Sequence, residues 1–371
     1  MKEQSSYSSN VANYEKKNTK IVYSNTQPLK SIAAPQKLKY SLSDFKAHQS
    51  LGSGSFGDVY LVQENLTHTY YAMKVLLKSK ILTSNIKRYA LTERNILSTL
   101  NHPFLVKLHS AFQTNEKLYL VQDYCAGGDL SQYLSREGKF NEDKARFYTG
   151  EIVLAIEYLH EKGIIYRDLK PDNIVLDGDG HVRLTDFGLS KVGIRDSDEI
   201  TKSFCGSYAY LAPEILSKNG HTMAVDWYLL GVVLFEMLTG LPPFYAPSKE
   251  TLFSNIRTAK LTFPPYISPN SQDLISKLLH RDPKKRLRER IKEHPFFEGI
   301  LWDKMIKKQY MAPEPYLKVR FEEFLRMDNK SNQEVETIFL KDMSREKQFT
   351  SVVSKESHHF AGWSYASDSL I

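Results

Sequence analysis

Residues 48–124 alternate short apolar runs with turn residues. The runs are rich in β-branched and aromatic residues, which predicts strands at about residues 48–62, 69–77, 106–113 and 117–124. Between the second and third runs, apolar side chains recur at helical spacing, at Ile86, Tyr89, Ala90, Ile96, Leu97 and Leu100. This part of the chain is expected to form a small sheet with one helix, residues 85–100, packed on it.

Beyond Gly127 and Gly128 the pattern becomes mostly helical. Asn141 is a suitable N-cap for a helix that ends before Gly163. The apolar stripe of this helix consists of Ala145, Tyr148, Ile152, Ala155, Ile156 and Leu159. A strand-rich part followed by a helix-rich part predicts an α+β fold with two lobes and a cleft between them.

Residues 224–238 are apolar on nearly all sides, although the segment contains Asp226 and Glu236. The segment is shorter than the roughly 20 residues that cross a bilayer. We therefore expect a helix buried in a large core, and no membrane segment.

Composition narrows the classes of protein that fit. The 371 residues are 41% hydrophobic and 25% charged, as in ordinary globular proteins, and include only two cysteines, Cys125 and Cys205. Few cysteines favour a reducing compartment over a disulfide scaffold, and residues 1–20 show no secretory signal. A cytoplasmic location is expected, with the nucleus as an alternative.

The net charge of +7 comes largely from residues 1–43, which hold seven lysines and two glutamates. These lysines are scattered and few aromatics lie between them, which favours a solvated tail over a nucleic-acid-binding patch. Residues 1–43, rich in Ser, Asn, Lys and Gln, are expected to be a disordered extension. No nucleic-acid partner is expected.

A glycine-rich loop lies between two of the predicted strands. It runs from Gly52 through Gly54 and Gly57 to Val59. Dinucleotide-binding folds use a similar string, but there a helix follows, whereas here a strand follows. The pattern favours a hairpin whose backbone amides approach a phosphate closely. An ordinary glycine-rich turn is the alternative.

Ala72-Met73-Lys74 ends the next predicted strand. The Lys74 ammonium would suit the phosphates of a nucleotide if a carboxylate oriented it, and Glu93 on the following helix is the candidate. The alternatives are a lysine that extends to solvent and an ordinary surface glutamate.

Two segments further on carry the groups that phosphoryl transfer requires. The run Tyr166-Arg-Asp-Leu-Lys-Pro-Asp-Asn173 contains a base, Asp168, and a cation, Lys170, and Asp186-Phe187-Gly188 follows it. Asn173 and Asp186 offer oxygen ligands for Mg²⁺. Positioning and charge neutralisation do most of the work in phosphoryl transfer, so this set of residues is well suited to it.

Together with Ala212-Pro213-Glu214, these segments resemble the signature of the protein kinase family. Lys170, two places after Asp168, resembles the serine/threonine type. The resemblance implies ATP and Mg²⁺, with Asp168 acting on the substrate hydroxyl, Lys170 on the γ-phosphate, and Asn173 and Asp186 as metal ligands. It also implies a catalytic domain at 44–299, with a small lobe at 44–124 and a large lobe at 127–299.

The resemblance further implies a nucleotide site and a peptide site. Adenine would lie between Val59 and Ala72 above and Val175 below, next to the backbone of Asp123 and Cys125, with Gln122 at the deep end. The other residues implied at the nucleotide are Gly52, Gly54, Gly57, Lys74 and Asp129. Substrate contacts are implied for Ser207 and for three carboxylates that would face arginines upstream of the target: Asp129, Asp172 and Glu236. Solvated carboxylates are the alternative for these three.

Some residues are implied to be structural. Glu214 and Arg286 would form an ion pair in the large lobe, and Asp226 would brace the catalytic loop. Leu97, Leu108, Tyr166 and Phe187 would form an apolar stack that links the lobes, and ordinary core packing would explain them equally well.

Residues 201–207 resemble the activation segment of the AGC group, which comprises the cyclic-nucleotide-dependent, S6 and Akt-like kinases. Ser203 matches the phosphorylated position, and a phosphate there would add about −1.5 to −2 charges near Arg167 and Lys191. The chain departs from the group at Tyr208-Ala209 and carries an acidic insert near residues 196–199.

Residues 300–371 are expected to be a tail of the AGC type. Residues 360–365, Phe-Ala-Gly-Trp-Ser-Tyr, resemble its hydrophobic motif and would dock on the small lobe beside the Glu93 helix. Phosphorylation is expected at Ser364 and Ser344. The partners implied are protein substrates and an upstream activating kinase, and a monomer is expected.

Two other functions remain open at this point. A pseudokinase scaffold would be expected to lack one of Lys74, Asp168, Asn173 or Asp186, and all four are present. A calcium/calmodulin-regulated kinase would need a basic amphipathic helix after the catalytic domain, and Lys304, Lys307 and Lys308 lie there.

Overall fold

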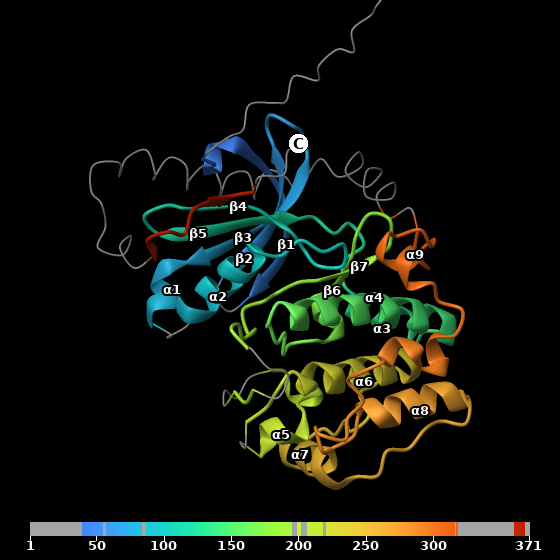
Figure 1. The fold of residues 1–371 in the computed structure, drawn as a ribbon. Helices are drawn as coiled ribbons and strands as arrows, with labels where there is room; N and C mark the ends of the chain where they lie inside the picture. The colour runs from blue at the N-terminus through green and yellow to red at the C-terminus, as the bar shows by residue number, and fades with distance from the viewer. Residues whose placement is uncertain are drawn as a thin grey trace, which may run out of the picture.

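The computed structural model describes residues 39–54, 57–83, 87–194, 199–201, 206–217, 220–315, 317 and 360–367. A lobe built on a sheet lies above a helical lobe, as Figure 1 shows. The two-lobed α+β fold expected from the sequence is confirmed.

The small lobe is built on a six-stranded antiparallel sheet with strand order β1-β2-β3-β5-β4-β8. The strands are β1 Phe45–Gly54, β2 Gly57–Glu64, β3 Tyr70–Leu77, β4 Leu108–Gln113, β5 Lys117–Asp123 and β8 Tyr365–Ala366. The hairpin predicted at the glycine loop within residues 48–62 is confirmed: β1 pairs with β2, and Gly54 pairs with Gly57.

Two helices accompany this sheet, α1 Lys78–Thr83 and α2 Lys87–Leu97 (Figure 1). The helix expected over residues 85–100 is therefore shorter than its apolar pattern. Helix α2 buries Ala90, Glu93, Ile96 and Leu97. A charged side chain on the buried face of a helix calls for a partner, which Lys74 provides below.

The first described helix begins slightly before the expected domain boundary at residue 44. A short 3₁₀ helix, Leu42–Asp44, precedes β1, and the Leu42 side chain is 1% exposed. Leu42 belongs to the same apolar cluster as Phe45 and Phe112. Residues 42 and 43 are thus part of the folded small lobe, while the rest of the expected disordered extension, up to residue 38, lies outside the described residues.

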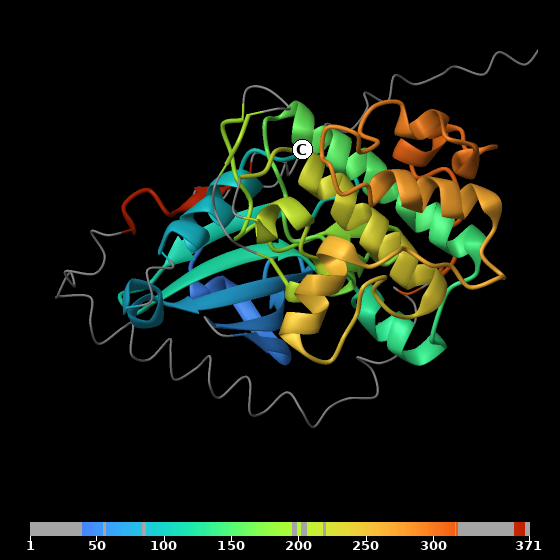
Figure 2. The ribbon, with the colours of Figure 1, turned by 90° about the horizontal axis from the view of Figure 1, so that it is seen from below.

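The large lobe is helical (Figure 2). Its helices are α3 Leu130–Glu137, α4 Glu142–Glu161, α5 Pro213–Leu216, α6 Ala224–Thr239, α7 Lys249–Thr258, α8 Pro269–Leu278 and α9 Trp302–Ile306. The remaining short turns are 3₁₀ helices at Pro171–Asn173, Tyr208–Tyr210, Ile291–Glu293 and Pro295–Phe297.

Helix α6 is the centre of this lobe. It packs against α4 and α8, and nearly all of its residues are buried, as the apolar run predicted. Helix α4 begins where expected, because the Asn141 side chain accepts from the backbone N–H of Lys144 at 2.8 Å. No helix in the described part of the chain is both long and apolar enough to cross a bilayer.

A small hairpin, β6 Ile174–Leu176 and β7 Val182–Leu184, lies at the top of the large lobe, facing the sheet. The loop before β6 carries Asp168 and Asn173, and Asp186 follows β7. The fold therefore brings both sequence segments with phosphoryl-transfer groups to the junction of the lobes.

Candidate active site

A cleft of about 780 Å³ lies between the lobes. Val59 and Ala72 line it from the small lobe and Val175 from the large lobe, with Asp123 and Cys125 on the connecting segment. Other predicted site residues that line it are Gly52, Gly57, Lys74, Glu93, Gln122, Asp129, Asp172, Asn173 and Asp186. A cleft of this size and mixed lining suits a nucleotide.

Among the loop glycines, Gly57 has a clear steric reason. A Cβ atom on Gly57 would lie 1.8 Å from the Val75 carbonyl oxygen of β3, so no other residue fits without moving the strand. A Cβ atom on Gly52 would meet no atom within 4 Å. Gly52 lies beside the cleft, so the open space above it can admit a ligand.

Lys74 and Glu93 form the ion pair that their positions predicted. The Lys74 ammonium donates to Glu93 Oε1 at 2.8 Å and Oε2 at 2.9 Å, and lies 3.5 Å from Asp186 Oδ1. Burial alone would lower the pKa of Lys74, but the two carboxylates outweigh it and raise that pKa. Lys74 is thus a cation held in place on the side of the small lobe that lines the cleft.

The Asp168 carboxylate is held by its own loop. Its Oδ2 accepts from Asn173 Nδ2 at 2.8 Å and lies 3.2 Å from Lys170 Nζ. Burial raises the pKa of Asp168, while Lys170 and Asn173 oppose that rise. A carboxylate with a raised pKa, next to a cation, is suited to accept a hydroxyl proton.

Asp226 braces this loop from the buried helix α6. It accepts from the backbone N–H of Tyr166 at 2.9 Å and of Arg167 at 2.7 Å, and its Oδ2 lies 2.8 Å from His160 Nε2. These bonds support Arg167, whose backbone has a φ of 70°. A non-glycine residue at positive φ is strained and needs such support.

Asn173 and Asp186 line the same cleft, as a shared metal site requires. The positive charge of Lys74 lowers the pKa of Asp186 against the opposing effect of burial, so this carboxylate is ionised. Ionised carboxylate and amide oxygens are donors that Mg²⁺ prefers, so the side chains present fit the ion.

The four side chains expected in an apolar stack between the lobes are buried in one core cluster. Leu97, Leu108, Tyr166 and Phe187 are each 2% exposed or less, and the Tyr166 and Phe187 rings are 5.2 Å apart. The Tyr166 hydroxyl also donates to the Thr185 carbonyl. Tyr166 thus fixes the strand that leads to Asp186.

The candidate substrate residues lie in different environments. Glu236 accepts from the Tyr210 hydroxyl at 2.7 Å. Burial, with a further contribution from the charge of Asp172, raises the pKa of Glu236 to about 7. The Asp129 carboxylate instead caps α3, accepting from Gln132 N at 3.0 Å and Ser131 Oγ at 2.5 Å. Asp129 is therefore already engaged in helix capping, whereas Asp172 is exposed at the cleft.

Ser207 lies at the catalytic loop, where its Oγ accepts from Lys170 Nζ at 3.0 Å. Ser203 and Ser344 lie outside the described residues. Tyr208, at the departure from the AGC pattern, begins a 3₁₀ turn and packs edge-on against Phe253 of α7 at 5.8 Å.

Glu214 and Arg286 form the expected buried pair. Arg286 donates to both oxygens of Glu214, at 2.7 and 3.0 Å, and to the Ala224 carbonyl at 2.8 Å. The Arg286 side chain is 0% exposed. The bidentate geometry ties the Ala212-Pro213-Glu214 segment to α6.

The C-terminal motif is docked on the small lobe. Phe360 and Trp363 are fully buried, and strand β8 pairs with β4 at the sheet edge (Figure 1). Arg94 of α2 donates to the carbonyls of Trp363 and Ser364, each at 3.0 Å. The Ser364 side chain is exposed beside this contact. The predicted docking beside the Glu93 helix is confirmed.

Comparison with known proteins agrees with this geometry. The protein kinase domain model matches residues 45–297. The chain belongs to the protein kinase family. The motifs described above are thus those of a kinase domain that fills most of the chain.

The relatives are serine/threonine kinases. The kinase is 47% identical over 281 residues to a "RAC family serine/threonine-protein kinase homolog" of Dictyostelium discoideum, covering 75% of this chain and 63% of the relative. It is 44% identical over 297 residues to a "RAC-beta serine/threonine-protein kinase" of Rattus norvegicus, covering 78% and 62%. "Protein kinase 2" of Dictyostelium discoideum is 39% identical over 356 residues, covering 93% and 71%.

The RAC kinases are of the AGC type, so the group expected from the motifs is confirmed. The chain spans less than two thirds of the length of the first two relatives.

Several residues at the site did not emerge from the sequence. Gly127 lies on the segment between the lobes, where a Cβ atom would come within 2.5 Å of Leu317 Cδ1 and 2.6 Å of Leu176. Arg183 and His109 both contact Asp123. All of these contacts join distant parts of the chain, and no local sequence pattern signals them.

Proposed function

We propose that this chain is an active protein serine/threonine kinase, which transfers the γ-phosphate of ATP to hydroxyl groups of proteins. One observation carries the proposal. The Lys74–Glu93 ion pair and Asn173 line the same cleft, and Asn173 belongs to a cluster with Asp168 and Lys170. A scaffold without activity would have no need to keep both sets in these contacts.

The residues divide the work of the transfer. The backbone of Asp123 and Cys125 would bind adenine between Val59, Ala72 and Val175, and Gly52, Gly54 and Gly57 would cover the phosphates. Lys74, held by Glu93, would orient the α- and β-phosphates. Asp168 would orient the hydroxyl and accept its proton as the oxygen–phosphorus bond forms, and Lys170 would neutralise the γ-phosphate.

Mg²⁺ would be held by Asn173 and Asp186, and when bound it supplies positive charge against the phosphate oxygens. The pairing of Asp186 with Lys74 at 3.5 Å keeps its carboxylate ionised and directed at the cleft.

Substrates with arginine upstream of the target serine or threonine are favoured by the carboxylates near the cleft. Asp172 is exposed and Glu236 is half-buried beside Tyr210. Ser207, bonded to Lys170, is placed to contact the substrate next to the hydroxyl. Asp129 would contribute less, because its carboxylate caps α3.

Activation would proceed by phosphorylation. An upstream kinase would phosphorylate Ser203, and Ser344 and Ser364 in the tail would be modified as well. The exposed Ser364 beside Arg94 supports this, because a phosphate there gains a nearby cation. The protein would act as a monomer in the cytoplasm, with the nucleus as an alternative.

The test is phosphate transfer to a serine peptide library that carries arginine at varied upstream positions, before and after treatment with an activating kinase. Asp168→Asn is the inactive control. Arginine-dependent transfer that rises when Ser203 is phosphorylated would support the proposal. Nucleotide binding without transfer in either state would favour the scaffold. Calmodulin binding by residues 295–320 would favour calcium regulation.

A further inference from the structure

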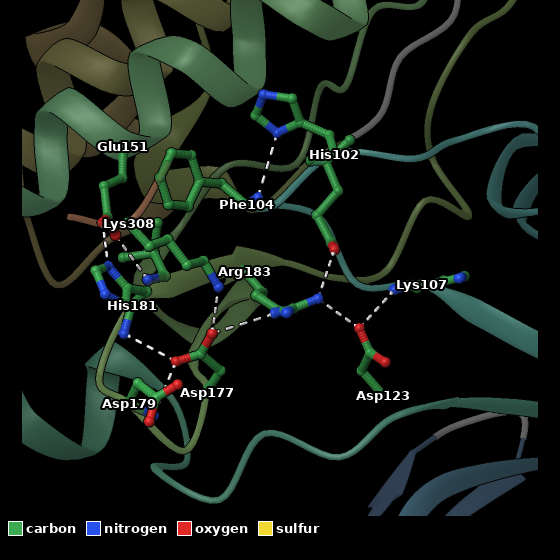
Figure 3. Close-up of polar contacts among 12 residues, drawn as sticks. His102, Phe104, Lys107, Asp123, Glu151, Asp177, Asp179, His181, Arg183 and Lys308 are labelled. Carbon is green, nitrogen blue, oxygen red and sulfur yellow. Dashed lines mark hydrogen bonds and ion pairs between the residues drawn. The ribbon is translucent and has the colours of Figure 1, made fainter. Parts of the chain in front are cut away.

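A row of alternating charges runs from the small lobe to the large lobe, and one member, Asp123, lines the cleft. Arg183 Nη1 donates to Asp123 Oδ2 at 2.5 Å, and His109 Nε2 lies 2.6 Å from the other oxygen. On the opposite side, Arg183 Nε lies 3.5 Å from Asp177 Oδ2, which also accepts from Lys308 Nζ at 2.5 Å. Figure 3 shows the Arg183 side chain lying between the two carboxylates.

The two ends of this row belong to elements with different tasks. Asp123 ends β5 and begins the segment that would bind adenine, while Arg183 lies on β7, three residues before Asp186. Asp123 is tied to the small lobe by two bonds with Lys107: the Asp123 N–H donates to the Lys107 carbonyl at 3.0 Å, and the Lys107 N–H donates to Asp123 Oδ2 at 3.1 Å. Arg183 thus joins the adenine-binding segment to the strand that leads to the metal-binding carboxylate.

Arg183 is held from the large-lobe side as well. Asp177 Oδ1 accepts from the backbone N–H groups of Asp179 and His181, at 3.1 and 3.0 Å, which fixes the turn of the β6–β7 hairpin. Lys308 reaches the same carboxylate from the segment that follows α9. The anchor for Arg183 is therefore part of a closed turn.

The charges in this row are partly shielded from water. The side chains of Arg183, Asp123 and Asp177 are 22%, 20% and 12% exposed. Burial alone would raise the pKa of Asp123, but its bond with His109 and the charge of Arg183 lower it. Partly buried pairs are weakly screened by salt and gain more than exposed ones.

We propose that Arg183 is a positioning residue for the nucleotide, because it fixes the distance between the adenine-binding backbone at Asp123 and the Asp186 carboxylate. The inference rests on the proposed function, in which one ATP molecule must reach both places. If two groups that bind the same ligand are displaced relative to each other, the ligand can no longer contact both well, and its affinity falls.

This role differs from that of an ordinary ion pair within one lobe. Glu214 and Arg286 both lie in the large lobe, so losing that pair affects stability. Asp123 and Arg183 come from opposite sides of the cleft, so losing their contact changes the relation of the lobes. The effect should therefore appear in nucleotide affinity.

The experiment compares Arg183→Met with Arg183→Lys, and uses Lys292→Met as the control. Lys292 also forms a partly exposed ion pair, 2.8 Å from Glu157, and neither residue lines the cleft. Each protein is tested for equilibrium binding of Mg²⁺–ATP, for the KM of ATP and of a peptide, for kcat, and for Tm.

Arg183→Met is expected to weaken ATP binding and to raise the KM for ATP about tenfold, which corresponds to ~1.4 kcal/mol. The KM for the peptide should stay unchanged. Arg183→Lys should recover part of the affinity, because an ammonium cannot bridge both carboxylates as the guanidinium does. Lys292→Met should bind ATP as the wild type does.

Unchanged ATP affinity in Arg183→Met, or an equal loss in Lys292→Met, would overturn the inference. If the wild type binds ATP but transfers no phosphate, the proposed function fails. A selective loss of ATP binding in Arg183→Met would still support the positioning role in that case.

Discussion

Lys170 contacts Ser207 across the site: its ammonium donates to Ser207 Oγ at 3.0 Å and lies 3.2 Å from Asp168 Oδ2. One cation therefore joins the catalytic loop to the segment that follows the candidate phosphorylation site. Asn173 completes the arrangement, since its amide donates to the same Asp168 oxygen at 2.8 Å. A movement of the activation segment at Ser207 would therefore displace Lys170, which contacts the candidate base Asp168.

The first prediction concerns this contact. Ser207→Ala removes the acceptor that holds Lys170, and kcat should fall about tenfold, the effect of losing one hydrogen bond to a charged group. Steady-state kinetics with a serine peptide measure the change. Ser207→Thr, which keeps the hydroxyl, should retain most of the activity, and equal losses in both variants would contradict the role of the hydroxyl.

The second prediction is a pH dependence that comes from Glu236, whose pKa burial and Asp172 raise to about 7. Because only the ionised carboxylate attracts arginine, the KM of an arginine-bearing peptide should fall about tenfold as pH rises from about 6 to 8. In Glu236→Gln this trend should be absent. A peptide without arginine is the control, and an equal trend for both peptides would exclude Glu236 as its cause.

The same group affects folding stability with the opposite sign. A carboxyl whose folded pKa lies above its unfolded value stabilises the fold while protonated. Its contribution is complete below pH 4.5 and is lost as pH rises through about 7. Glu236→Gln should therefore make the protein relatively more stable at pH 8 than at pH 6, compared with the wild type, as measured by denaturant unfolding.

The third prediction concerns the buried pair of Arg286 and Glu214. Arg286→Ala leaves the Glu214 carboxylate buried without its bidentate partner, which should cost about 3–5 kcal/mol of unfolding free energy. Chemical denaturation measures the loss. Arg290→Ala, on an exposed pair with Glu293, should cost far less unfolding free energy, because water screens that pair. Similar losses in both variants would contradict the structural role of Arg286.

The fourth prediction concerns the docked tail. Trp363 is fully buried, and its indole N–H donates to the Tyr119 carbonyl at 3.2 Å, so Trp363→Ala should release residues 360–367 from the sheet. Hydrogen exchange at β4 and α2 should increase, and activity should fall because α2 carries Glu93. Ala361→Ser, at an exposed position of the same segment, is the control. Unchanged exchange in Trp363→Ala would contradict the docking.

The identity of the charged residues at the candidate site could be predicted from the sequence better than the contacts that hold them in place. Asp168, Asn173 and Asp186 lie in two short segments whose residue types and spacing are informative without a structure. The Lys74–Glu93 pair could be predicted because it joins one strand to the helix that follows it. The boundaries were less accurate. The helix expected over residues 85–100 spans only Lys87–Leu97, because Leu100, although buried, lies beyond the end of α2.

Contacts between distant segments could not be predicted in the same way. Strand β8 has only two residues, too few for an alternating pattern, and joins the sheet because Phe360 and Trp363 bury their rings. Arg183 looks like any polar residue of a short strand until the fold places it between Asp123 and Asp177. Asp129, which the sequence analysis expected at the nucleotide and the substrate, also caps helix α3, a contact that was not predicted.

The most direct test of phosphotransfer pairs two measurements on the wild type and Asp168→Asn: Mg²⁺–ATP affinity, and the rate of γ-phosphate transfer to a serine peptide. The variant should bind ATP as the wild type does and transfer phosphate about 10²–10⁴ times more slowly, because only the group that accepts the proton has changed. Equal transfer rates in the two proteins, or no transfer by a wild type that binds ATP, would contradict the account.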